Sequence, residues 1–231
     1  MVSVKRIDRK IQEGFRLRED KARLPDACDI WLEAWDEIKE ALIESDVTEI
    51  LKLNSMYGWM THLNHYTQYL RMELFNAGVH DAKYVKKLIV FCQELLQCCG
   101  DDNDTIRDTR CDLAEAYYRI GEINAGETLY TDLIKEDADD AQPYVFWAYD
   151  LIDSPVPDSK NYDKAEEILI TAFKRPALRQ DISVLEALVN LYKAKDEPEK
   201  TKEYEELIEE QWRADMEDHK AMLESLGGFW Q

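Results

Sequence analysis

Apolar residues recur at spacings of three and four nearly from one end of this 231-residue chain to the other. Such spacing places them along one face of an α-helix, and no alternating run of β-branched residues competes with it. Helix breakers are scarce, because the chain holds only eight glycines and six prolines. That scarcity disfavours a loop-rich β-sandwich or a glycine-rich nucleotide fold. The sequence therefore predicts an all-α protein, long enough for one or two domains.

Turn and capping residues set the expected limits of these helices. Asp46 or Ser45 is expected to cap a short helix, Gly78 to close a long one as its left-handed C-terminal residue, and Gly121 to turn the chain. The stretch 150–161 contains two prolines and is expected to be a loop. The helices expected from periodicity span residues 4–18, 24–42, 47–53, 56–77, 82–100, 105–120, 122–133, 162–173, 182–194 and 198–226.

Two segments of the chain repeat the same pattern at an offset of 34 residues. They are Arg110-x-x-Leu113-Ala114-x-x-Tyr117 and Tyr144-x-x-Trp147-Ala148-x-x-Leu151. The period and the large-small-large pattern resemble the tetratricopeptide (TPR) repeat family. Positions matching that family's turn and second helix follow at Gly121-Glu122, Gly126, Tyr130 and Leu133, although Ala138 stands where the family normally has proline.

Weaker units flank this stretch. The run 161–167 resembles the family's entry into a second helix, and Leu185-x-x-Leu188-Val189-x-x-Tyr192 resembles a further first helix. In the N-terminal half, Ala27-x-x-x-Trp31-x-x-Ala34 has the spacing of a second TPR helix, with Gly14 on its expected partner. The segment 71–78 resembles bacterial TPR-like proteins that can accompany a SEC-C metal-binding motif. That cysteine-rich motif is missing, so no metal is expected from the association.

The resemblance implies an α-solenoid of stacked antiparallel helix hairpins with a right-handed superhelical twist. Stacking covers the faces that a lone helix pair leaves open, and Ala114, Ala148 and Ala165 are the expected close contacts. The long, densely charged helix from Pro198 is expected to cap the array. The polar run at 100–104 suggests divergent hairpins over 1–100 and more regular repeats with the capping helix over 101–231, together forming one continuous solenoid.

The chain is strongly acidic. Lys and Arg number 29 against 49 Asp and Glu, for a net charge of −20, and residues 1–24 alone carry an excess of basic residues. An acidic surface repels nucleic-acid phosphate and anionic lipid, so we expect neither as a partner, and it attracts basic ones. The basic start is interpreted as a solvated helix face, docked on acidic neighbours. The chain shows no signal peptide or membrane span, which favours a cytoplasmic location.

Side chains that carry chemistry give little support for an enzyme. The five cysteines occupy mostly apolar helical positions and are interpreted as reduced core residues, with a redox-sensitive Cys98-Cys99 pair as the alternative. His62 and His65 lie three apart on one expected helix and could hold a metal, but no third ligand is evident. No phosphate-binding loop or nucleophile elbow is present. We therefore predict no catalytic, metal or cofactor site.

The TPR resemblance implies a concave groove lined by the first helix of each repeat. One turn away from the packing positions, the groove residues are expected to be Gln68, Met72, Glu115, Tyr118, Val145, Tyr149, Glu186 and Asn190. The basic clamp that some family members use for a C-terminal carboxylate is absent, because Cys111, Glu115, Val145 and Tyr149 occupy its positions. Tyrosine and methionine in an acidic groove suit an apolar or basic peptide.

Three classes of function follow. The first is a non-catalytic protein-interaction module or adaptor that binds a peptide or protein segment. The alternatives are a nucleic-acid or membrane-surface binder using the basic N-terminal helix, and an enzyme. Near the end of the chain, Phe229 and Trp230 are expected either to fold back near Tyr204, Ile208 and Trp212 or to insert into a second copy, giving a homodimer.

Overall fold

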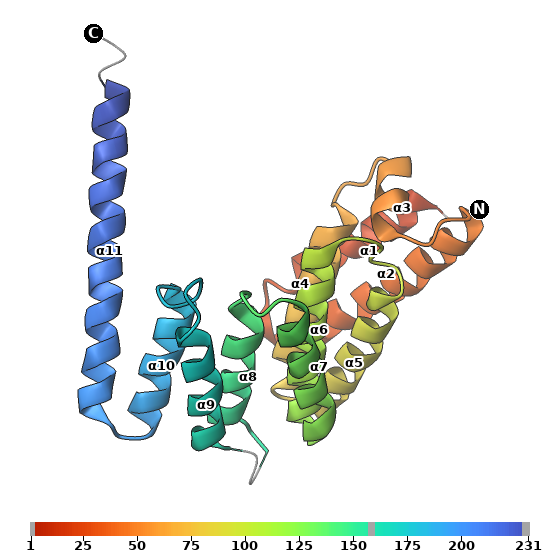
Figure 1. Ribbon diagram of the computed structural model, residues 1–231. Helices are drawn as coiled ribbons and strands as arrows, with labels where there is room; N and C mark the ends of the chain where they lie inside the picture. The colour runs from red at the N-terminus through yellow and green to blue at the C-terminus, as the bar shows by residue number, and fades with distance from the viewer. Residues whose placement is uncertain (1–2, 157–159, 228–231) are drawn as a thin grey trace. The chain divides into compact units, whose positions relative to one another are not determined.

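The computed structural model describes residues 3–156 and 160–227, with side chains up to Glu217 apart from Asp215. These residues form eleven α-helices and one short 3-10 helix, and no β-strand (Figure 1). The prediction of an all-α protein is confirmed. The chain divides between Gly126 and Glu127 into two compact units, which are described separately.

The first unit is built from helices that pack on their neighbours in sequence. α1 packs on α2, α4 on α5 and α5 on α6, while α4 also contacts α2 and α6. This order of contacts is consistent with stacked helix hairpins. The helices are α1 (Val4–Leu17), α2 (Leu24–Glu44, after the 3-10 turn Lys21–Arg23), α3 (Ile50–Met56), α4 (Leu63–Gly78), α5 (Ala82–Leu96) and α6 (Asn103–Arg119).

The hairpin formed by α1 and α2 packs around the side chain of Trp31. This side chain is fully buried, and its Nε1 donates a hydrogen bond to the carbonyl oxygen of Ile11 at 2.9 Å. Tyr66 Oη donates in turn to the carbonyl oxygen of Trp31 at 2.5 Å, which ties α4 to the same point. Gly14 on α1 faces the indole so closely that a Cβ built there would lie 2.1 Å from Trp31 Nε1. Position 14 must therefore be a glycine for α1 and α2 to pack this closely against each other.

The second unit repeats the same order of contacts. α7 (Ile123–Glu136) crosses the division between the units, and α8 (Gln142–Ile152), α9 (Tyr162–Phe173), α10 (Ile182–Ala194) and α11 (Pro198–Gly227) follow. α8 packs on α9, α9 on α10 and α10 on α11, and α8 also contacts α10 (Figure 1). The three alanines expected at close helix contacts, in α6, α8 and α9, are all fully buried: Ala114, Ala148 and Ala165.

The carboxylate of Glu166 links three helices of the second unit. Glu166 on α9 accepts hydrogen bonds from Tyr192 Oη on α10 at 2.9 Å and from Lys200 Nζ on α11 at 3.2 Å. It also pairs with Lys195, which follows α10. The hydrogen bond from Lys195 is the main reason that the pKa of Glu166 is lowered to about 2. Glu166 therefore stays ionised and links α9 to both helices of the last hairpin.

Several expected helix boundaries are wrong, and the helix expected to run to Gly100 already ends at Leu96. Gly78 is the last helical residue of α4, and Val79, which follows it, has an ordinary right-handed φ of −60°. Asp46 does not cap a helix but takes a left-handed φ of 54° after α2 has ended. The helix expected from residue 56 begins at Leu63 instead. The amide of Leu63 donates to Asn54 Oδ1 at 2.9 Å, and His62, which precedes it, has a non-helical ψ of 133°.

Candidate protein-interaction surfaces

Helices α4 and α6 of the first unit carry four of the residues expected to line a groove. Gln68 and Met72 on α4 are exposed, and Glu115 on α6 is half-buried beside Arg119, with 3.7 Å between Oε1 and Nη2. Tyr118 is only 1% exposed. Its ring packs against Gly126 at the start of α7, where a Cβ would come within 2.6 Å of it. Tyr118 therefore belongs to the helix packing rather than to a ligand-facing surface.

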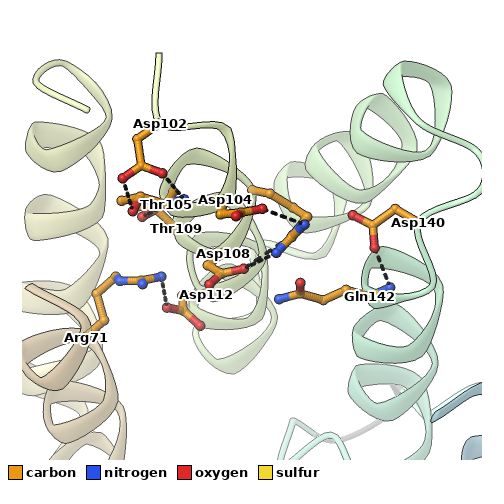
Figure 2. A network of polar contacts seen from close by, with 10 residues as sticks. Arg71, Asp102, Asp104, Thr105, Asp108, Thr109, Asp112, Asp140 and Gln142 are labelled. Carbon is orange, nitrogen blue, oxygen red and sulfur yellow. Dashed lines mark hydrogen bonds and ion pairs between the residues drawn. The ribbon is translucent and has the colours of Figure 1, made fainter. Parts of the chain in front are cut away.

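Next to this face, a charged pair lies inside the contact between α4 and α6. Arg71 is 5% exposed and donates from Nη1 to Asp112 Oδ2 at 2.5 Å (Figure 2). Burial raises the pKa of the Asp112 carboxyl, and the Arg71 charge opposes that shift. Among the described residues, Arg71 Nε has no hydrogen-bond partner. No local pattern in the sequence predicts a buried arginine here, because its partner lies on another helix.

Asp102 sets the start of α6, close to this pair. Its carboxylate accepts hydrogen bonds from the amide of Thr105 at 3.2 Å and from the hydroxyl of the same residue at 2.8 Å (Figure 2). Arg107, one turn further along, pairs with Asp104 at 3.2 Å and with Asp108 at 3.1 Å. The beginning of α6 therefore presents a cluster of carboxylates with a single arginine among them.

These carboxylates form part of an acidic hollow of about 720 Å³ in the first unit. Two amide side chains and Leu51 complete its lining, which brings together the start of α3, the start of α4 and the segment before α6. A surface of this kind attracts cationic groups in preference to anionic ones. The lining residues are Glu49, Leu51, Asn64, Asp101, Asp102, Asn103 and Asp104.

In the second unit, two expected groove residues from different helices meet. Asn190 on α10 donates from Nδ2 to Tyr149 Oη on α8 at 3.0 Å, across 41 residues of sequence. Glu186, one turn before Asn190, is exposed. Val145 is 5% exposed and is part of the packing. The face shared by α8 and α10 is therefore polar, and Tyr149, Glu186 and Asn190 reach its surface.

A second hollow, of about 370 Å³, lies between α2 and α5. Trp35 and Phe91 form its floor, with their ring centroids 4.9 Å apart. Most charges on its rim are already compensated, since Lys39 pairs with Glu94 at 2.8 Å and Lys87 with Asp29 at 2.6 Å. This hollow could not be predicted from the sequence, because its walls come from helices that are distant in sequence.

The basic residues of α1 lie partly on the acidic face of α2, as expected. Arg6 Nε is 2.9 Å from Glu37 Oε2, and Lys10 Nζ is 2.6 Å from Glu33 Oε2. Lys10 is also 3.2 Å from the second carboxylate oxygen of Glu37. This prediction is confirmed: Arg6 and Lys10 of the first helix form ion pairs with carboxylates of α2.

All five cysteines are buried and free, as expected. Cys98 and Cys99 both donate to the carbonyl oxygen of Leu95, at 3.3 and 3.1 Å. Burial is the largest cause of the raised thiol pKa values, about 12 for Cys98 and about 11 for Cys99. Because the thiolate is the reactive form, these side chains act as core residues at neutral pH.

The two neighbouring histidines are exposed. His62 Nδ1 is 2.9 Å from Asn54 Nδ2, and the rings of His62 and His65 are 6.2 Å apart. In the part of the chain that the structure describes, no group of three or more His, Cys, Asp and Glu side chains is arranged to hold a metal ion. Within the same residues, no helix combines the length and apolar character needed to cross a membrane.

Comparisons of the chain with protein-family models, with curated proteins and with solved structures found no match.

Proposed function

We propose that this protein is a non-catalytic protein-interaction module whose hairpins stack as a right-handed, TPR-like solenoid. The observation that carries the proposal is the contact between α8 and α10. It joins the first helices of two successive hairpins and brings Tyr149 and Asn190 within 3.0 Å of each other. In a stacked array, the first helices line one continuous face, and that face is the ligand surface of the proposed module.

The partner that we propose is a basic or apolar peptide segment. The expected groove residues that reach the surface are Gln68, Met72 and Glu115 in the first unit and Tyr149, Glu186 and Asn190 in the second, and none of them is a cation. The net charge of the chain is −20, which favours encounters with cationic segments. The acidic hollow beside α6 adds to this preference. Phe229 and Trp230 lie outside the described residues, so neither their fold-back onto the last hairpin nor their insertion into a second copy forms part of the proposal.

The alternative use of α1 as a nucleic-acid or membrane binder receives less support. Arg6 and Lys10 are engaged with carboxylates of α2, so a phosphate would have to compete with these ion pairs. The rest of the acidic surface would also repel a polyanion at long range.

A charge reversal on the first-helix face tests the proposal. Peptides selected from a random display library on the intact protein should be rich in Lys, Arg and apolar residues. Glu186→Lys should weaken their binding about tenfold or more, because it places a cation on the face that receives them. Fluorescence anisotropy measures the affinity, which should also fall as salt rises.

The matched control is Glu167→Lys on α9. It makes the same charge change at an exposed position on the second helix of a hairpin, and should leave binding nearly unchanged. Equal losses in the two variants would indicate only a general charge effect. Selection of acidic peptides, or binding that ignores Glu186→Lys, would contradict the proposed surface.

A further inference from the structure

The last helix is far longer than the helix that supports it. α11 has 30 residues and α10 has 13, which correspond to about 45 Å and about 20 Å of helix. α10 and α9 cover the beginning of α11, where Tyr204 stacks on Tyr192 at 5.5 Å and meets Phe173 edge-on at 5.5 Å. Figure 1 shows the remainder of α11 continuing beyond the end of α10.

The apolar stripe of α11 extends beyond the part of the helix that α9 and α10 cover. Tyr204 and Ile208 are buried, and the next residues at the same spacing of four are Trp212 and Met216. Those two side chains are 54% and 73% exposed. Residues four apart lie on nearly the same side of a helix, so the stripe that packs on α10 continues into solvent. An uncovered helix half with large apolar side chains is only marginally stable alone and marks a contact surface.

The packing of the other hairpins indicates which kind of structural element would cover this stripe. In both units the second helix of a hairpin also packs on the first helix of the next one, as α5 does on α6 and α9 on α10. α11 is the second helix of its hairpin, and no helix follows it among the described residues. The occupant that reproduces this packing is another helix.

The charge of the uncovered half indicates which kind of helix fits. From residue 209 to residue 227 the sequence holds six acidic and two basic residues. A second copy of α11 would place like charges side by side, which disfavours self-association. A helix with Lys and Arg beside an apolar stripe would meet both the charge and Trp212 and Met216.

We infer that the uncovered half of α11 docks a basic amphipathic helix of a partner protein, with Trp212 and Met216 as its apolar anchors. This site goes beyond the proposed peptide face on α8 and α10, because it uses a different surface and takes a helix rather than an extended segment. Binding at either surface can therefore be abolished without affecting binding at the other.

The test uses the full chain and a fluorescent amphipathic helical peptide of about 18 leucine and lysine residues. Anisotropy should show saturable binding, and Trp212→Ser/Met216→Ser should weaken it about tenfold or more. The matched control is Ile43→Ser/Met60→Ser, which removes two side chains that are 81% and 75% exposed on the first unit. That control, and Glu186→Lys, should bind as the unmodified protein does.

Hydrogen exchange gives a second readout that does not depend on a variant. Binding of the peptide should slow exchange in residues 209–227 more than in any other segment. The inference is overturned if the peptide does not bind, if the Ser variants bind as well as the control, or if a leucine–glutamate peptide binds equally. It is also overturned if protection lies elsewhere, or if sedimentation shows that α11 already pairs with a second copy.

Discussion

Replacement of Gly14 by alanine should lower the free energy of unfolding by about 3 kcal/mol, at the upper end of the cost of overpacking a core. The added Cβ would lie 2.1 Å from Trp31 Nε1 and 2.4 Å from Trp31 Cδ1. The indole cannot move aside freely, because it is fully buried and donates a hydrogen bond to Ile11. α1 must therefore separate from α2, which also disturbs the ion pairs of Arg6 and Lys10.

Gly58→Ala is the matched control for that substitution. A Cβ at Gly58 has no atom within 4 Å, so the variant should be neutral or slightly stabilising through the unfolded state. Urea denaturation of both variants measures the difference. If Gly14→Ala were as stable as Gly58→Ala, the close packing of α1 on α2 described above would be incorrect.

Removal of the Asp112 carboxylate should lower the free energy of unfolding by an amount similar to or greater than that expected for Gly14→Ala. Asp112→Ala leaves the Arg71 guanidinium 5% exposed and without its carboxylate. Because arginine does not lose its proton, the charge stays buried, and breaking such a pair costs about 3–5 kcal/mol. The double variant Arg71→Met/Asp112→Ala should recover much of that loss, since it removes both charges.

The single variant Arg71→Met should behave differently with pH. Burial already raises the folded-state pKa of Asp112, and loss of Arg71 raises it further. An acid with a raised folded-state pKa binds its proton more tightly when folded, so stability falls as pH rises through that pKa. The stability lost in Arg71→Met should therefore be smaller at about pH 5 than at about pH 8.

Asp104→Ala is the control on the same helix. Asp104 pairs with Arg107 but is 86% exposed, so its loss should cost less than about 1 kcal/mol. Denaturation curves for the four variants, collected at both pH values, test this set. A loss for Asp112→Ala no larger than that for Asp104→Ala would show that the buried Arg71 guanidinium does not depend on Asp112 for its compensation.

The sequence predicted those features that depend on local pattern. The helical periodicity located nearly every helix, because an amphipathic stripe must be buried whatever covers it. Ala114, Ala148 and Ala165, which were expected at helix contacts, are fully buried. The acidic partners of the basic first helix were also expected from its charge.

Features that depend on contacts between distant helices could not be read from the sequence. Arg71 is buried because Asp112 lies opposite it on another helix. Tyr118 and Val145 had the spacing of surface residues but are covered by packing. Gly78 matches a helix terminator in sequence but stays helical in α4, where a Cβ would lie 2.6 Å from Val85 Cγ2. In each case a neighbouring helix decides the outcome.

Photo-crosslinking tests the central claim, that the first-helix face of α8 and α10 is the peptide-binding surface, most directly. A benzophenone amino acid would be placed at Glu186 in one variant and at Glu167 in another, and each would be irradiated with a peptide selected on the intact protein. The proposal predicts a crosslink from position 186, blocked by excess unlabelled peptide, and none from position 167. Crosslinking from 167 alone, or equally from both, would contradict it.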